Sequence, residues 1–342
     1  MANLDELVAN MKTEYNMEDS VFPTGINPLD LLLDGGLSCG ITQIVGDNST
    51  GKSTLALQIS YSYCKSGKNV LYISTKGDIT SEDLKMLNLL EYKDKQFIYV
   101  CEGIFDKVEN LLNKFINTGE ISLIVIDSIA SLMNSGYFLT NSKAIKSDNG
   151  NSGYNSKPLS ILVKKLAIWS YKKNIAVIAV NQYRNTIQMY GKNAGTKTKI
   201  AGPKSLINES KYVVEIHSIN ESNHNCKDFR DCFFGVERLN KGKPFELYMN
   251  KGRHPGATLP YFFEYGNGYN SIYPLVKFSL EKGIIVQNGT YYSIEVNDIK
   301  CKGMNNFLVE FQKQLPDDYS SYVDQYYISL LTASAVDTDT TS

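Results

Sequence analysis

The chain has 342 residues, of which 42% are hydrophobic and 21% charged, and this suits one large α/β core with small appendages. Its 35 Lys and Arg residues balance 36 Asp and Glu residues, which excludes a uniformly basic nucleic-acid-binding protein, so any affinity for nucleic acid must come from local patches. The six cysteines are dispersed and form no CxxC pair, which argues against disulfides and is typical of a reduced cytosolic compartment.

The N-terminal segment predicts a short amphipathic helix outside the core. Leu4, Leu7, Val8 and Met11 recur at helical spacing. The segment has neither the basic start nor the apolar run of a signal peptide, and no later stretch approaches the roughly 18 apolar residues of a membrane span. We therefore expect residues 1–20 to form an N-terminal helix and polymerisation arm.

A repeating pattern of apolar strands and helices begins at residue 41. Strands are predicted over 41–45, 69–74, 97–101, 122–127 and 175–180, and helices from Lys52, Ser81, about Phe105 and Pro158. Continuous apolar strands that alternate with helices are typical of βαβ units and of a parallel sheet covered on both faces. The predicted fold class is therefore α/β, with a doubly wound, mainly parallel sheet.

Two long polar segments interrupt this pattern. Residues 134–157 and 183–208 are rich in Gly, Ser, Asn and Lys and have no apolar periodicity. Each exceeds the roughly 12–15 residues beyond which a structureless loop is usually functional or disordered. Both follow core strands or their turns, so we expect them to be functional loops.

Shorter strand-like runs follow residue 211 and predict antiparallel strands at one edge of the sheet. Asn288 and Gly289 lie between two such runs and predict a hairpin turn. We assign residues 21–300 to the core, 301–332 to a small C-terminal helical unit and 333–342 to a flexible tail.

The stretch GDNSTGKST at 46–54 matches the phosphate-loop pattern G-x-x-x-x-G-K-[ST] between a predicted strand and a predicted helix. Its backbone N–H groups would surround a β-phosphate at the helix N-terminus. Lys52 would reach the β- and γ-phosphate oxygens, and the Ser53 hydroxyl would bind Mg²⁺. A turn that merely starts a helix does not explain a lysine directly after Gly51. The predicted nucleotide contacts are Gly46, Asn48, Ser49, Thr50, Gly51, Lys52, Ser53 and Thr54.

Two strand ends predict further contacts with the nucleotide. Asp127 ends the fourth core strand, where an acid anchors the magnesium shell through water. Alone, such an Asp is often a helix cap, but the upstream phosphate loop favours the metal role. Gln182 ends the next strand and would contact the γ-phosphate. The predicted metal ligands are Ser53 and Asp127, and the predicted cofactors are ATP and Mg²⁺.

His224, Cys226 and Cys232 are candidate ligands for a second metal site. No fourth ligand stands at a recognised spacing. The pattern favours a solvated loop.

Four segments in this order resemble the RecA family of strand-exchange recombinases, most closely its UvsX-like phage branch. They are PTGINPLDLLLDGGLSCG at 23–40, LIVIDSIASL at 123–132, VNQYR at 180–184 and the stretch at 265–293. The resemblance covers nearly the whole chain and implies a RecA-type P-loop NTPase core. It also implies a helical filament on DNA, with ATP at each protomer interface and the two polar segments lining the DNA channel.

The partners implied by the resemblance are single-stranded DNA, homologous duplex DNA, further copies of the chain, and loader and single-strand-binding proteins. No membrane partner is expected. The implied location is the cytoplasm of a bacterial or phage-infected cell, in association with the nucleoid.

The second polar segment supports DNA contact independently, because it concentrates cations where no acid occurs between Asn181 and Asn208. Tyr183 and Tyr190 would offer stacking surfaces to unpaired bases. A lysine-rich loop is more often simply solvated, so this interpretation rests partly on the resemblance. The predicted DNA-binding residues are Tyr183, Arg184, Lys192, Lys197, Lys199 and Lys204.

The stretch MNKGRHP at 249–255 resembles the family segment whose cations reach ATP across the interface, in the manner of an arginine finger. An ordinary exit from a strand is the alternative. Only four residues of the chain are arginine, which favours the interface role for Lys251 and Arg253. The predicted catalytic set is Lys52, Asp127, Gln182, Lys251 and Arg253.

Two positions depart from the family pattern. Where the family has a glutamate that orients the attacking water, this sequence has Lys76. An ammonium can only donate hydrogen bonds, so either Asp78 substitutes or turnover is slow. The tyrosine that covers adenine is missing from the region 81–83, and Thr80 with Asp83 predicts a helix cap instead.

The sequence therefore predicts an ATP-dependent recombinase with DNA-dependent ATPase activity that forms filaments on single-stranded DNA and promotes homologous pairing and strand exchange. A second hypothesis, motivated by Lys76, is a hydrolysis-deficient paralogue that acts as a nucleotide- and DNA-binding accessory or mediator. A helicase core is disfavoured, because no separate primase-like or duplex-splitting domain is visible.

Overall fold

The computed structural model describes residues 20–135, 156–188, 195–219, 242–264, 267–271, 283–294 and 299–303, with isolated residues between 274 and 328. The predictions for the N-terminal arm, most of the first polar segment and the flexible tail lie outside the described residues. So do those for His224, Cys226 and Cys232.

The described strands are β1 (Gly40–Gly46), β2 (Asn69–Ser74), β3 (Phe97–Cys101), β4 (Ile121–Asp127), β5 (Ala176–Gln188), β6 (Gly195–Ile200), β7 (Ser210–Ser218), β8 (Gly242–Lys251), β9 (Thr258–Glu264), β10 (Gly268–Tyr269), β11 (Val286–Asn288), β12 (Tyr291–Ile294) and β13 (Ile299–Lys302). The described α-helices are α2 (Asn27–Leu32), α3 (Lys52–Lys65), α4 (Ser81–Met86), α5 (Phe105–Thr118), α7 (Ser156–Lys173) and α8 (Lys204–Glu209), and two 3-10 helices are η1 (Leu90–Tyr92) and η2 (Ile129–Ser131).

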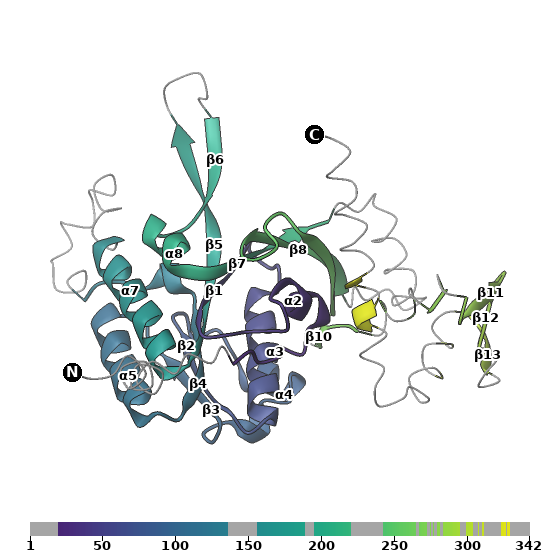
Figure 1. Ribbon diagram of the computed structural model, residues 1–342, viewed down its shortest axis with the longest axis horizontal. Coiled ribbons are helices and arrows are strands. Elements are labelled where there is room, and N and C mark those ends of the chain that lie inside the picture. The colour runs from purple at the N-terminus through teal and green to yellow at the C-terminus, as the bar shows by residue number, and fades with distance from the viewer. Residues whose placement is uncertain are drawn as a thin grey trace, which may run out of the picture.

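A large twisted sheet forms the centre of the molecule (Figure 1). Its strand order is β10-β9-β8-β7-β1-β5-β4-β2-β3. The strands from β7 to β3 are parallel, and β8, β9 and β10 continue the sheet in antiparallel fashion at one edge. The predicted α/β class with antiparallel strands at one edge is confirmed. Because parallel strands end at the same edge, the segments after β1, β2, β4 and β5 meet there.

Helices cover both faces of this sheet, with α2, α3 and α4 on one face and α5 and α7 on the other (Figure 1). Ile44 of β1 belongs to the same buried cluster as Ile59 of α3. Ile41 belongs to the cluster that contains Leu166 of α7. Since side chains alternate along a strand, Ile41 and Ile44 point to opposite faces. Both faces are covered by helices, so nearly every side chain of the strand is buried, and this explains why the strand sequence contains few polar residues.

The predicted helix starts agree closely with the structure. Helices begin at Lys52, Ser81 and Phe105 as expected, and α7 begins at Ser156, two residues before Pro158. Proline is tolerated in the first turn of a helix because its missing N–H would have no partner there.

One strand is longer than its sequence pattern indicated. The apolar run ends at residue 180, but β5 continues to Gln188, and residues 183–188 pair with β6 in antiparallel register. The two strands form a ribbon that projects from the body of the molecule (Figure 1). A projecting ribbon has no core face to cover, so it needs no apolar alternation. The second polar segment is therefore partly a β-hairpin rather than a structureless loop.

The predicted hairpin at Asn288 and Gly289 is confirmed. Asn288 pairs with Tyr291 across the turn, and Gly289 has φ +60°. These strands do not extend the central sheet, however, because β11, β12 and β13 form a three-stranded sheet of their own. Most of the predicted C-terminal helical unit lies outside the described residues. None of the helices that the structure describes has the length and apolar character needed to cross a lipid bilayer.

Candidate functional site

The phosphate loop joins the end of β1 to the start of α3. Gly51 precedes the helix with φ +78°, a conformation that favours glycine. A Cβ at Gly51 would also lie 2.9 Å from the ring of Phe263. Gly51 has no side chain to cap α3, so the N–H groups of the first helical turn remain for an anion.

One cavity of about 370 Å³ opens beside this loop. Its lining residues are Asn48, Ser49, Thr50, Gly51, Lys52, Ser53, Thr54, Lys76, Asp78, Asp127, Ser128, Val180, Asn181 and Gln182. The structure thus brings the predicted loop residues together with Asp127 and Gln182, which end separate strands. Gly46 is not among the lining residues and lies at the end of β1, in register with Gln182.

Lys52 is held over the loop by oxygen atoms of the loop itself. Its Nζ donates to the carbonyl oxygen of Asp47 and lies 3.4 Å from the hydroxyl of Thr50. Burial lowers the pKa of Lys52, although the negative charges of Asp127 and Asp47 oppose this shift. A polyphosphate in the cavity would add negative charge and favour the ammonium form.

Asp127 is a buried carboxyl group at the far wall of the cavity, 7% exposed. Burial raises its pKa, against the effect of hydrogen bonds from Ser53 and Tyr72. The Tyr72 hydroxyl donates to Asp127 Oδ2 at 2.9 Å. The contact between Ser53 and Asp127 places the two predicted metal ligands together. Tyr72 was missed from the sequence, although a tyrosine within the apolar run of β2 was a usable signal.

A tight turn after β2 brings Lys76 and Asp78 to the same cavity. The Ser74 hydroxyl accepts the N–H groups of Lys76 and Gly77 at 3.3 and 3.0 Å and donates to Asp78 Oδ1 at 3.4 Å. A carboxylate is therefore present on the cavity wall two residues after the expected position. That Asp78 takes over the role of the missing glutamate stays a prediction.

A second cavity of about 220 Å³ adjoins the first, since both are lined by Ser53, Thr54 and Asp78. Its further lining residues are Leu57, Ile79, Asp83, Met86 and Leu87. Helix α4 forms one wall of this cavity.

The helix cap predicted for α4 is present. The Thr80 hydroxyl accepts the N–H of Asp83 at 3.2 Å, and the Asp83 carboxylate accepts the N–H of Thr80 at 2.8 Å. This reciprocal pair fixes the start of the helix that walls the second cavity.

The β5–β6 hairpin presents two of the predicted DNA-binding cations on one face. Arg184 and Lys199 are exposed and are directly paired across the two strands. Lys204 is exposed at the start of α8. Lys192 and the side chain of Lys197 lie outside the described part of the chain.

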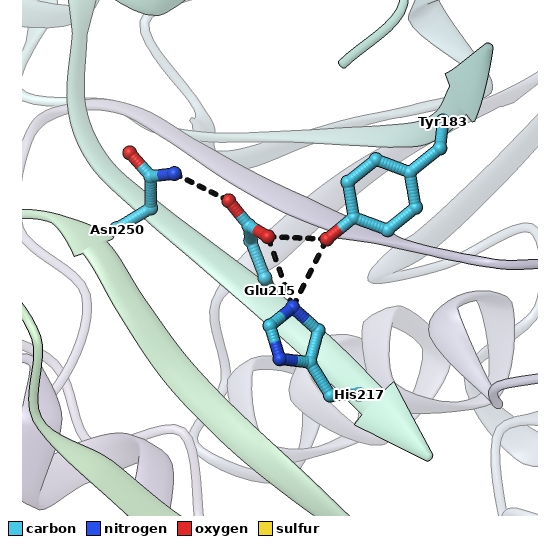
Figure 2. A network of polar contacts seen from close by, with 4 residues as sticks. All are labelled: Tyr183, Glu215, His217 and Asn250. Carbon is cyan, nitrogen blue, oxygen red and sulfur yellow. Dashed lines mark hydrogen bonds and ion pairs between the residues drawn. The ribbon is translucent and has the colours of Figure 1, made fainter. Parts of the chain in front are cut away.

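Tyr183 points the other way, toward Glu215 of β7 (Figure 2). Side chains alternate along a strand, so the residue before Arg184 faces the opposite side of the hairpin. The Tyr183 hydroxyl donates to the carboxylate of Glu215, which also binds His217 and Asn250. The stacking role predicted for Tyr183 is untested, but its hydroxyl is already engaged. Sequence reasoning missed Glu215, an acid within the apolar strand VVEI.

Lys251 and Arg253 do not line the cavity of their own chain. Lys251 lies level with Val213 on β7, toward the amino ends of the parallel strands. Its Nζ donates to the carbonyl oxygens of Ile207 and Asn208 at 2.9 and 2.8 Å. These carbonyls belong to the last turn of α8, where a cation is favourable.

Arg253 is bound by an acid of its own chain. Its Nε lies 3.3 Å from Asp34 Oδ2, and the Arg253 side chain is 65% exposed. His254 Nε2 lies 2.7 Å from the other oxygen of Asp34. The predicted interface cations are thus separate from the cavity within one protomer.

Comparison with known proteins shows similarity along most of the chain. Residues 5–228 match the family model described as the RecA N-terminal domain. DNA repair protein recA homolog 3, mitochondrial, from Arabidopsis thaliana is 23% identical over 324 residues, which cover 94% of this chain and 70% of that protein. A plasmid RecA protein of Lactococcus lactis is 25% identical over 84% of this chain and 77% of its own length. DNA repair and recombination protein RadB of Methanosphaera stadtmanae is 28% identical over 50% of this chain and 72% of its own length.

Proposed function

Because this chain belongs to the RecA family, we propose that it is an ATP-dependent recombinase that forms filaments on single-stranded DNA and promotes homologous pairing and strand exchange. Relatives named for DNA repair and recombination support a role in these processes. The observation that carries the proposal is the cavity shared by the phosphate loop, Asp127 and Gln182, with a cationic hairpin that begins directly after Gln182.

The nucleotide proposed for this cavity is ATP with Mg²⁺. The phosphate loop supplies N–H donors and Lys52 supplies a cation for the phosphates. Ser53 and Asp127 fit a hard cation, because both present oxygen atoms and they lie in hydrogen-bond contact. The bound metal would neutralise phosphate charge during hydrolysis.

We assign the base of the nucleotide to the second cavity. Ile79, Met86 and Leu87 line it and supply apolar contact in place of the missing tyrosine. Thr80 and Asp83 are committed to the cap of α4, so these residues support the shape of the cavity rather than base stacking.

DNA contact by the hairpin is supported by the pairing of Arg184 with Lys199. Like charges directly opposite each other destabilise a strand pair. A phosphate backbone along this face would remove that repulsion and release counterions. Mutation of Lys199 should therefore weaken DNA binding and flatten its dependence on salt concentration.

The interface role of Lys251 and Arg253 is supported by their position away from their own cavity. Because both cations lie away from the cavity of their own chain, a contact with a nucleotide would have to involve the nucleotide of a neighbour. This arrangement would couple assembly to nucleotide state. The finer placement in the UvsX-like phage branch is part of the same proposal and is supported by the Lys-x-Arg spacing of these two residues.

A hydrolysis-deficient accessory protein is the second candidate, and Lys76 favours it. An ammonium in the cavity would stabilise bound ATP without activating water. Asp78, on the same cavity wall, favours the first candidate instead.

Steady-state ATP hydrolysis with and without single-stranded DNA separates the two candidates. We expect DNA to raise the turnover of the wild-type protein above that of a Lys52→Ala control. We further expect Asp78→Asn to lower turnover by about 100-fold if Asp78 orients the water. Turnover equal to that of the Lys52→Ala control would leave only the accessory role.

Electron microscopy with single-stranded DNA and a slowly hydrolysed ATP analogue tests the filament directly. Helical filaments are the expected result and do not depend on hydrolysis. Isolated particles under conditions that saturate both ligands would contradict the recombinase and leave a binding protein.

A further inference from the structure

A buried carboxylate on β7 contacts side chains of β5 and β8 (Figure 2). Glu215 of β7 is 7% exposed. Its Oε2 accepts a hydrogen bond from the Tyr183 hydroxyl, and its Oε1 accepts one from the side-chain amide of Asn250. His217 Nε2 lies 3.0 Å from Oε2 and 3.1 Å from the Tyr183 hydroxyl.

Both donors are direct chain neighbours of residues proposed for ATP binding. Tyr183 follows Gln182 on β5 and is the first residue of the hairpin pairing. Asn250 precedes Lys251 at the end of β8. Glu215 therefore connects the strand that reaches the cavity of its own protomer with the strand that carries the cation proposed to reach a neighbour.

The contacts of Glu215 with Tyr183 and Asn250 can transmit a movement of one strand to the other. A buried carboxylate is costly unless its oxygens are hydrogen-bonded, so a movement of either strand that breaks one contact is opposed. Burial and the bond to Glu215 raise the pKa of Tyr183, which keeps its hydroxyl protonated and able to donate. Glu215 also lies level with Val45, the residue before Gly46.

We infer that Glu215 is a positioning residue that couples ATP binding to DNA binding, by joining the β5–β6 hairpin to β7 and to the Asn250–Lys251 end of β8. The inference rests on the proposed function, since it assumes that ATP fills the cavity and that DNA contacts the hairpin. Glu215 touches neither ligand. Through its hydrogen bonds, Glu215 determines how strongly ATP binding in the cavity restricts the position of the hairpin.

Coupling of this kind is reciprocal, so the same coupling factor can be measured from the DNA affinity and from the ATP affinity. If ATP raises the affinity for DNA by some factor, DNA must raise the affinity for ATP by the same factor. A residue that only supports the fold would change the affinities without changing this factor. The coupling factor is therefore the quantity to measure, and it does not require hydrolysis.

The experiment uses the full chain, a fluorescein-labelled oligo-dT and a non-hydrolysable ATP analogue. DNA affinity is measured with and without the analogue, and analogue affinity with and without DNA. For the wild-type protein we expect a coupling factor of about 5 to 150. For Glu215→Gln, which keeps the shape of the side chain, we expect a factor near 1, with DNA affinity in the absence of nucleotide within about twofold of wild type.

Two further variants make the test specific. Glu246→Gln removes a half-buried carboxylate on β8, level with His217, and should leave the coupling factor unchanged. Asn250→Ala changes an exposed residue and so should fold even if Glu215→Gln does not. It removes the hydrogen bond from Glu215 to β8 while the contact with Tyr183 on β5 remains, and it should lower the factor to an intermediate value.

The outcomes separate this inference from the function on which it rests. A wild-type factor near 1 would overturn both. A large wild-type factor that survives in Glu215→Gln and Asn250→Ala would overturn the coupling role and leave the recombinase intact. Equal weakening of DNA binding with and without the analogue would show that Glu215 only supports the fold.

Discussion

The cavity beside the phosphate loop differs from the segment around Lys251 and Arg253 in what its charged groups contact. In the cavity, Lys52 and Asp127 face an open volume of about 370 Å³. At the other site, Lys251 binds the final carbonyls of α8 and Arg253 binds Asp34. In the proposed assembly, the cavity residues already line one volume within a single protomer, whereas Lys251 and Arg253 would have to exchange their intrachain partners for the nucleotide of a neighbour.

This difference predicts that the two sites respond differently to mutation. Changes in the cavity should alter ATP affinity of the isolated protomer. Changes around Arg253 should alter assembly and leave the isolated protomer unaffected.

The largest effect is expected for Lys52→Ala, which should weaken binding of ATP to the protomer by about 100-fold. The lost contact is a charge-assisted hydrogen bond, worth about 3 kcal/mol. Titration with a fluorescent ATP analogue measures the change. Lys65→Ala, at the exposed end of the same helix, is the matched control. Affinity within about threefold of wild type would show that the cavity is not the phosphate site.

Arg253→Ala should leave ATP affinity unchanged but lower nucleotide-dependent assembly on single-stranded DNA by about tenfold or more. Light scattering with the slowly hydrolysed analogue reports assembly. Mixing this variant with Lys52→Ala should restore part of the assembly, because one variant supplies an intact cavity and the other an intact Arg253. Loss of ATP affinity in Arg253→Ala, without recovery on mixing, would place this residue at the nucleotide of its own chain.

Thr80→Ala tests whether α4, which forms a wall of the second cavity, depends on its N-terminal cap for stability. Removing a side-chain cap costs about 1 kcal/mol, so we expect the midpoint of thermal unfolding to fall by about 2–4 °C. Calorimetry or circular dichroism measures the shift. Thr80→Ser keeps the hydroxyl and should restore most of the stability. An unchanged midpoint would mean that packing alone holds α4.

The smallest effect is expected for Asp34→Asn, which removes the intrachain acid that binds Arg253. Exposed ion pairs contribute about 0–1 kcal/mol, so assembly should begin at roughly half the wild-type protein concentration. Asn tolerates the positive φ of +56° at this position, so the backbone is preserved. Asp94→Asn, at another exposed residue with φ +60°, controls for charge. Weaker assembly in Asp34→Asn would contradict this competition for Arg253.

Several elements were predictable because their signals are local. The strands 69–74 and 97–101 and the helix starts at Lys52, Ser81 and Phe105 follow from apolar runs and from the phosphate loop. Thr80 and Asp83 form a cap through residues three apart. The ribbon formed by residues 183–188 and 195–200 was not predictable, since strands that project from the core leave no apolar period in the sequence.

The order of apolar strands and the G-x-x-x-x-G-K-S motif by themselves determined the α/β fold and the position of the phosphate loop, because side-chain period and glycine conformations are properties of short segments. Only the tertiary structure decided that Tyr183 faces Glu215 rather than solvent, and that Lys251 binds the end of α8. These partners lie 32 and 44 residues apart in the chain, and strand register, which no local pattern encodes, brings them together.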